Sequence, residues 1–112
     1  MENRQLHYFV AIAELGSVAA ASRTLHVAQP ALTRQIQNLE SLLDVELFHR
    51  HSRGMELTQA GKQFYHDAIR IIRSIERAKS QAVKANQGDI GYLKIGITPQ
   101  HLWLTEVQQH LS

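Results

Sequence analysis

The stretch from Gly16 to Glu40, GSVAAASRTLHVAQPALTRQIQNLE, contains two helix signals separated by a very short connection. Ser17 is a good helix N-cap, because its hydroxyl can accept a hydrogen bond from an unpaired backbone N–H, and it predicts a helix over residues 18–25. Pro30 lies in the first turn of a second helix predicted over residues 28–43, where its missing N–H costs nothing. The two residues between these helices leave room only for a tight turn, so the stretch predicts a helix-turn-helix.

The predicted helix over residues 28–43 has an apolar face and an opposite polar face. Its apolar residues follow one another at spacings of 4, 3 and 4, as in a helix with one side in a core: Leu32, Ile36, Leu39 and Leu43. The polar face carries side chains that can reach DNA base edges or phosphates. The face consists of Pro30, Arg34, Gln37, Asn38 and Ser41, and Gln29 and Thr33 flank it at the N-terminal end of the helix. An ordinary solvated helix face has a similar composition, so the pattern by itself leaves both interpretations open.

Another helix and two extended segments flank this motif. A helix is predicted over residues 5–15, where apolar side chains recur with helical spacing. Residues 45–48 and 55–57 are short strand-like runs around a polar, basic tip that ends in glycine. They predict a hairpin, or wing, that presents Arg50 and Arg53.

A long helix is predicted over residues 59–86, with Thr58 as its cap. Apolar residues recur along it at alternating spacings of 4 and 3, which is typical of a seam that another helix covers. The seam consists of Phe64, Ala68, Ile71, Ile75, Ala78 and Ala82. One helix cannot bury such a seam, so we predict a homodimer. The alternative is packing within the same chain, because the core of the N-terminal domain needs apolar residues from this region.

The C-terminal residues predict the beginning of another domain. Residues 87–89 contain a glycine that we expect to end the long helix, and residues 91–97 alternate as a strand does. An amphipathic segment over residues 102–111 follows. The expected fold is therefore mainly α: a winged helix-turn-helix over residues 1–58, a linker helix over 59–87, and the truncated first βα unit of an α/β domain over 88–112.

Composition narrows the class of protein but does not reveal its partner. The 112 residues include 44% hydrophobic side chains, enough for a core, and no cysteine, which excludes disulfides and thiolate metal sites. No apolar run approaches the ~20 residues of a membrane span, and no signal peptide is visible, so we expect a cytoplasmic protein without membrane contact. Residues 1–60 carry five arginines and six carboxylates, a net charge of −1, so charge alone does not predict DNA binding.

No enzyme, metal or cofactor site is evident in the sequence. His49 and His51 on the predicted wing lack the further ligands that a zinc site requires. The chain has no nucleophile with a suitably spaced base, no phosphate-binding glycine loop and no paired carboxylates. We expect a binding protein without a cofactor.

Several runs resemble the LysR-type transcriptional regulators: GSVAAA at 16–21, LHVAQPALTRQI at 25–36, LE at 39–40, LF at 47–48 and LT at 57–58. The segments around Ala28 and Arg34 look most like the branch that controls the degradation of aromatic compounds. The resemblance implies a dimer or tetramer on a partly palindromic promoter site. It also implies a C-terminal domain that senses a small-molecule inducer, of which this chain holds only the start. Thr98 lies where the family commonly contacts that effector, a role open only to a full-length chain.

Within this resemblance, Gln29 and Arg34 are expected to contact base edges in the major groove, because Gln pairs with adenine and Arg with guanine. Thr33 is expected to donate to a phosphate, Pro30 to pack on a sugar or a thymine methyl, and Gln37 to contact backbone or bases. In the wing, Arg53 is expected to enter the minor groove and Arg50 to contact phosphate.

Two positions depart from the family pattern, and two other functions stay open. Ala28 stands where the family usually has a capping serine, and Asp44 where it favours glycine. A winged-helix module that binds another protein is one alternative, consistent with the near-neutral first 60 residues. A winged-helix regulator of another type, such as the molybdate-responsive one, is the other.

Overall fold

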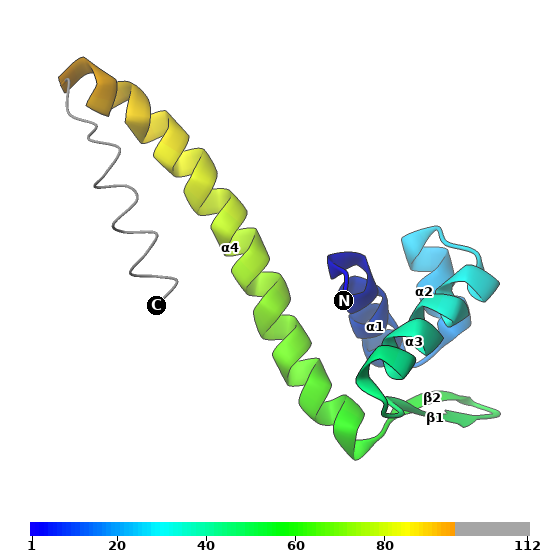
Figure 1. Ribbon diagram of the computed structural model, residues 1–112. Helices are drawn as coiled ribbons and strands as arrows, with labels where there is room; N and C mark the ends of the chain where they lie inside the picture. The colour runs from blue at the N-terminus through cyan, green and yellow to red at the C-terminus, as the bar shows by residue number, and fades with distance from the viewer. Residues whose placement is uncertain (96–112) are drawn as a thin grey trace. The chain divides into compact units, whose positions relative to one another are not determined.

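The computed structural model describes residues 1–95, with side chains described through residue 88. It is mainly helical (Figure 1). The elements in chain order are α1 (Asn3–Leu15), α2 (Val18–Leu25), α3 (Gln29–Leu43), β1 (Phe48–His51), β2 (Gly54–Leu57) and α4 (Gln59–Ile95). The chain divides into two compact units after Ile75, within α4. The first unit is the expected winged helix-turn-helix with the start of the linker helix.

Phe9 lies at the centre of the core of the first unit. Its side chain is fully buried, and its ring centroid lies 5.3 Å from that of Phe48 and 5.1 Å from that of Phe64. The apolar face predicted for α3 is confirmed, since Leu32 and Leu39 are fully buried and Ile36 is 1% exposed. Burial of one such side chain contributes about 1.5–3 kcal/mol, so this face fixes how α3 sits on α1.

The helix-turn-helix begins and ends as the sequence predicts. Gly16 closes α1 with a left-handed φ of 70°, and the Ser17 hydroxyl accepts a hydrogen bond from the backbone N–H of Ala20 at 3.1 Å. His26 ends α2, also with a left-handed φ of 57°. The Ser22 hydroxyl donates to the carbonyl of Val27, which fixes the turn before α3.

The wing is a two-stranded antiparallel hairpin in which Arg50 pairs with Met55. The strand predicted over residues 45–48 is displaced, because β1 starts only at Phe48. The backbone before it bonds to the end of α3 instead: Val45 N–H donates to the Glu40 carbonyl at 3.2 Å, and Leu47 N–H to Glu40 Oε2 at 2.7 Å. These N–H groups are therefore not available for a ladder.

The predicted end of the long helix at residues 87–89 is wrong, because α4 continues through Gly88 to Ile95. The predicted strand over residues 91–97 is consequently wrong for residues 91–95. A single glycine in a helix interior costs only about 1 kcal/mol, which good helix formers on both sides can offset. Residues 96–112, with Thr98 and the segment 102–111, lie outside the described residues.

Two residues of the predicted dimer seam belong to the core of their own chain. Ala68 is fully buried, and Phe64 packs against Phe9. Because the first turns of α4 close the core of the winged helix, assigning Ala68 to a dimer interface is wrong, whereas the place of the partly exposed Phe64 in the seam stays a prediction. The exposed part of the seam begins at Ile71, which is 40% exposed.

Gly61 allows α4 to start close to the segment that precedes β1. A Cβ added there would lie 2.1 Å from the Leu47 carbonyl oxygen, and the adjacent Thr58 N–H donates to that same oxygen at 3.0 Å. Thr58 caps α4 as predicted, since its hydroxyl accepts from Gly61 N–H at 2.9 Å.

We predict opposite effects of alanine at the two glycines of α4. Gly61→Ala forces the backbone of α4 away from Leu47 and should lower the free energy of unfolding by about 1–3 kcal/mol. Gly88→Ala should raise helix stability by about 0.5–1 kcal/mol, because a Cβ there meets no described atom within 4 Å. Urea unfolding followed by circular dichroism measures both. A neutral Gly61→Ala would contradict the close approach, and a destabilising Gly88→Ala would contradict the continuous helix.

Candidate nucleic-acid interface

The polar face of α3 is exposed over its first two turns. Gln29, Pro30, Arg34 and Gln37 are exposed and Thr33 is half-buried, so the structure brings together the five α3 residues that the sequence singles out. Pro30, Arg34 and Gln37 lie on the side opposite the buried face, whereas Gln29 and Thr33 flank that side at the start of the helix.

The N-terminus of α3 is open as well. Ala28 is the N-cap residue and makes no side-chain hydrogen bond, while its carbonyl accepts from Leu32 N–H at 3.0 Å. Pro30, in the first turn, has no N–H to satisfy. The unpaired N–H groups of a helix start carry partial positive charge and attract anions such as phosphate.

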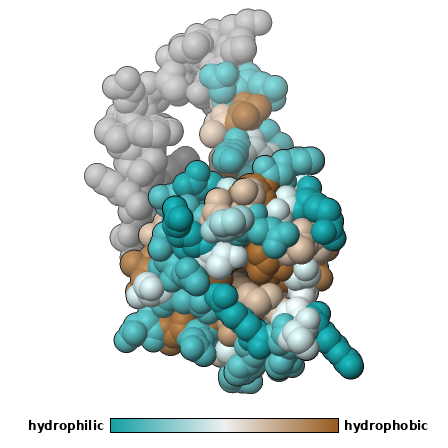
Figure 2. Space-filling view, turned by 90° about the vertical axis from the view of Figure 1, so that its right-hand side faces the viewer, coloured by the Kyte–Doolittle hydropathy of each residue, from teal (hydrophilic) through white to brown (hydrophobic). Residues whose placement is uncertain are grey.

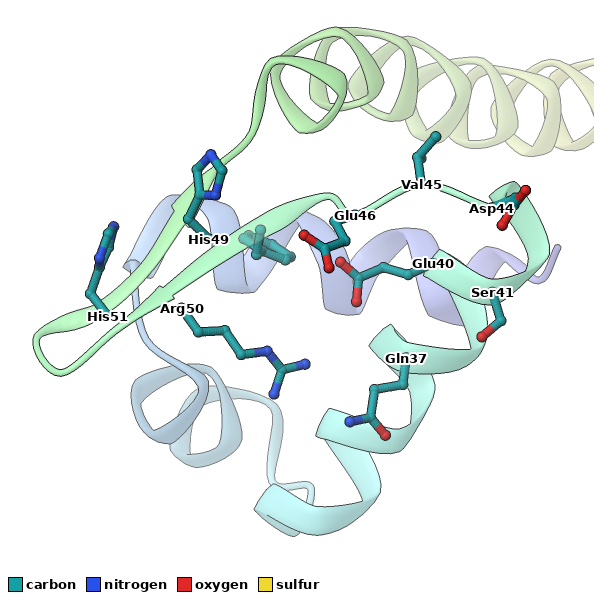
Figure 3. A pocket seen from close by; sticks show the side chains of 10 residues that line it. Gln37, Glu40, Ser41, Asp44, Val45, Glu46, His49, Arg50 and His51 are labelled. Carbon is teal, nitrogen blue, oxygen red and sulfur yellow. The ribbon is translucent and has the colours of Figure 1, made fainter.

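An open groove of about 810 Å³ separates the C-terminal half of α3 from the wing. Figure 3 shows Arg50 reaching from β1 toward Gln37 of α3, while His49 points to the other side of the hairpin. The groove is electrostatically mixed, because three carboxylates also line it: Glu40, Asp44 and Glu46. Arg50 therefore supplies its main positive charge.

The arginines of this surface are free to bind. Arg34, Arg50 and Arg53 are exposed, and within residues 1–88 none of them forms an ion pair with a carboxylate. Arg53 lies in the turn of the hairpin, between β1 and β2. In the same wing, His51 Nε2 lies 2.9 Å from Glu56 Oε2, so Glu56 is engaged by the opposite strand.

Glu40 is a positioning residue that the sequence did not reveal. Its carboxylate accepts from Leu47 N–H at 2.7 Å and so joins the end of α3 to the start of the wing. Glu40 belongs to the LE run that resembles the LysR regulators, but its role depends on a contact with a residue seven positions further along the chain, beyond the end of α3. The role of Glu40 becomes visible only from the path of the chain between α3 and β1, which brings Leu47 back to it.

Asp44, which stands where the family favours glycine, has a left-handed backbone with a φ of 57°. Aspartate tolerates this conformation better than most residues, although glycine does so at lower cost. The part of the chain that the structure describes places no group of three His, Asp or Glu side chains where they could hold a metal ion. None of its helices is long and apolar enough to cross a membrane.

Three helices around one core, a hairpin wing and an exposed polar helix face define a winged helix-turn-helix protein. The family described as "Bacterial regulatory helix-turn-helix protein, lysR family" matches residues 3–62. The chain belongs to this LysR family.

Curated relatives carry regulator names. The chain is 50% identical over 95 residues to the "HTH-type transcriptional regulator ClcR" of Pseudomonas putida, a match that covers 85% of this chain and 32% of that protein. It is 38% identical over all 112 residues to the "Uncharacterized HTH-type transcriptional regulator YnfL" of Escherichia coli, of which it covers 38%. The chain thus spans about a third of the length of these relatives.

Solved structures show the same fold. The DNA-binding domain of CbnR, in a complex with DNA, matches with a TM-score of 0.75 and 50% identity over 77% of this chain and 99% of that one. The DNA-binding domain of BenM, bound to benA site 1 DNA, matches with a TM-score of 0.73 and 41% identity over 76% and 99% of the two chains.

The uncapped start of α3 leads to a prediction. Ala28→Ser supplies a hydroxyl to an N-cap residue whose backbone is already extended, with φ of −60° and ψ of 139°. It should raise the free energy of unfolding by about 0.5–1 kcal/mol. Thermal unfolding measures the change, and Ala28→Val, which adds bulk without an acceptor, is the control. Equal stabilities of the serine and valine variants would contradict an open cap.

Proposed function

We propose that this chain is the DNA-binding part of a LysR-type transcriptional regulator that binds a partly palindromic promoter site as a dimer or tetramer. The observation that carries the proposal is the exposed polar surface of α3, where Arg34 has no carboxylate partner among residues 1–88 and where Gln29 and Gln37 are exposed as well. The complexes of the CbnR and BenM domains with DNA support it. The protein acts in the cytoplasm, as a binding protein rather than an enzyme.

In this proposal, Gln29 and Arg34 read base edges in the major groove. Thr33 donates to a phosphate, and Pro30 packs on a sugar or a thymine methyl. Gln37 faces Arg50 across the groove (Figure 3). Both side chains contact the sugar-phosphate backbone of one DNA strand and so set how far α3 lies from it. Arg53, at the turn of the wing, enters the minor groove.

The variant Arg34→Ala tests whether Arg34 contacts a base edge. The variant should lose about 1–3 kcal/mol of binding free energy on a duplex from the protein's own upstream region, and less on random DNA. Footprinting locates the site, and fluorescence anisotropy measures the affinities. The matched control is Arg4→Ala, because Arg4 is exposed but paired with Glu2 at 3.2 Å.

Equal losses by Arg34→Ala on both DNAs would show that Arg34 reads no base. A wild-type protein without preference for the upstream duplex would instead favour the second candidate, a module that binds another protein. The observation that favours this candidate is the net charge of −1 on residues 1–60.

We also propose that a second copy covers the exposed part of the α4 seam. In the first compact unit this part consists of Ile71, which is 40% exposed, and the half-buried Ile75. In the second unit, Ala78 and Ala82 are exposed and small enough for a close helix approach. The domain organisation follows: residues 1–58 bind DNA, and the helix from residue 59 pairs two copies. An effector domain binds the inducer, with Thr98 as one contact, only in a longer chain.

Ile71→Glu is expected to convert dimers to monomers and to weaken operator binding, because it places a charge in the apolar seam. Sedimentation velocity measures the oligomeric state. Val83→Glu is the matched control: Val83 is 58% exposed on another face of α4. A persistent Ile71→Glu dimer would rule out this interface.

A further inference from the structure

The positive charge of the chain is concentrated on α4 rather than on the winged helix. Residues 59–88 carry six Lys or Arg side chains and two carboxylates, whereas residues 1–58 carry five arginines and six carboxylates. Four basic side chains of α4 within the first compact unit, all of them exposed, form what we call the basic stripe: Lys62, His66, Arg70 and Arg73.

The basic stripe lies on the face of α4 that points away from its apolar side. At about 100° per residue, its four side chains lie within about 60° of the direction opposite Phe64, Ile71 and Ile75. A second copy that covers the apolar seam therefore leaves the stripe accessible. In the second unit, Arg77 and Lys84 continue the same spacing along the helix.

Two of the side chains in the basic stripe have no carboxylate partner among residues 1–88. The Tyr65 hydroxyl donates to Glu14 Oε2 at 2.8 Å, and this carboxylate raises the pKa of Tyr65. Asp67 pairs with Arg70, whose guanidinium lowers the pKa of that carboxyl. Lys62 and Arg73 have no carboxylate partner within residues 1–88.

The basic stripe also borders an open groove that is large enough for the phosphate backbone of a DNA strand. This open groove of about 630 Å³ is lined by His66, Arg70 and Arg73 along one side, and Glu14 lies in it bonded to Tyr65. Figure 2 views the molecule from the right-hand side of Figure 1, where the winged helix faces the reader, and hydrophilic side chains surround separate apolar patches there.

We propose that the basic stripe binds the phosphate backbone of double-stranded DNA outside the base pairs contacted by α3 and the wing. The inference rests on the proposed function. DNA-binding proteins commonly neutralise several phosphates with Lys and Arg side chains. The winged helix presents only three arginines for this purpose, and its remaining charged side chains are mostly carboxylates. The stripe supplies the missing cations, and it strengthens binding to any sequence equally because phosphates carry no sequence information.

The double variant K62Q/R73Q tests the stripe in the full 112-residue chain. Fluorescence anisotropy over a salt series, on the upstream duplex and on a random duplex of equal length, should show a log K against log salt slope that is smaller by about two units. Affinity should fall by the same factor on both DNAs. The matched control is K79Q, because Lys79 is exposed on α4 but paired with Glu76 and lies off the stripe.

Each outcome decides the proposal. An unchanged slope of log K against log salt for K62Q/R73Q would overturn the proposal. The stripe would then bind no DNA, and an acidic protein would become the alternative partner. A change in K79Q that is as large per charge removed would overturn the proposal as well, because the effect would then belong to total charge. If the wild-type chain binds both duplexes equally, the sequence-specific function fails, while the salt slope on random DNA still tests the stripe. Sedimentation of each variant separates loss of dimers from loss of phosphate contacts.

Discussion

The burial of Phe9 is the interaction on which the rest of the first unit depends. Its ring contacts Phe48 and Phe64, at centroid distances of 5.3 and 5.1 Å, so residues from α1, β1 and α4 meet in one aromatic cluster. Each aromatic pair contributes about 0.5–1.5 kcal/mol beyond the area it buries. Leu32 and Leu39 of α3 are buried in the same core. The polar face of α3 is exposed because the apolar face is committed to this cluster.

Close backbone approaches then fix the wing. A Cβ at Gly54 would lie 2.3 Å from the Gly16 carbonyl oxygen, and that oxygen accepts from Met55 N–H at 2.9 Å. The hairpin is therefore attached to the turn between α1 and α2. Glu40 attaches its other end to α3 through Leu47. In the proposed function this placement of the wing matters, because groups that contact DNA bind well only when their positions are set before DNA arrives.

The distribution of charge explains why composition is a poor guide to this protein. A winged helix with a net negative charge can still present Arg34, Arg50 and Arg53 where no carboxylate of residues 1–88 pairs with them. Glu14 and Glu56, by contrast, are hydrogen-bonded by Tyr65 and His51. The placement of charge decides which surface attracts a polyanion, because the field near a surface depends on local, unpaired groups more than on the total.

The sequence by itself determined the local features: the starts of α2, α3 and α4, which Ser17, Pro30 and Thr58 mark, and the polar face of α3. These depend on capping and on helical period, which act over a few residues. The prediction that Gly88 ends the long helix was wrong, because one glycine costs a long helix little free energy. Only the tertiary structure decided that Phe64 and Ala68 serve their own core, that β1 starts after the Glu40–Leu47 contact, and where the wing lies. Those outcomes depend on contacts between segments distant in the chain, and such contacts leave no periodic signal in the sequence.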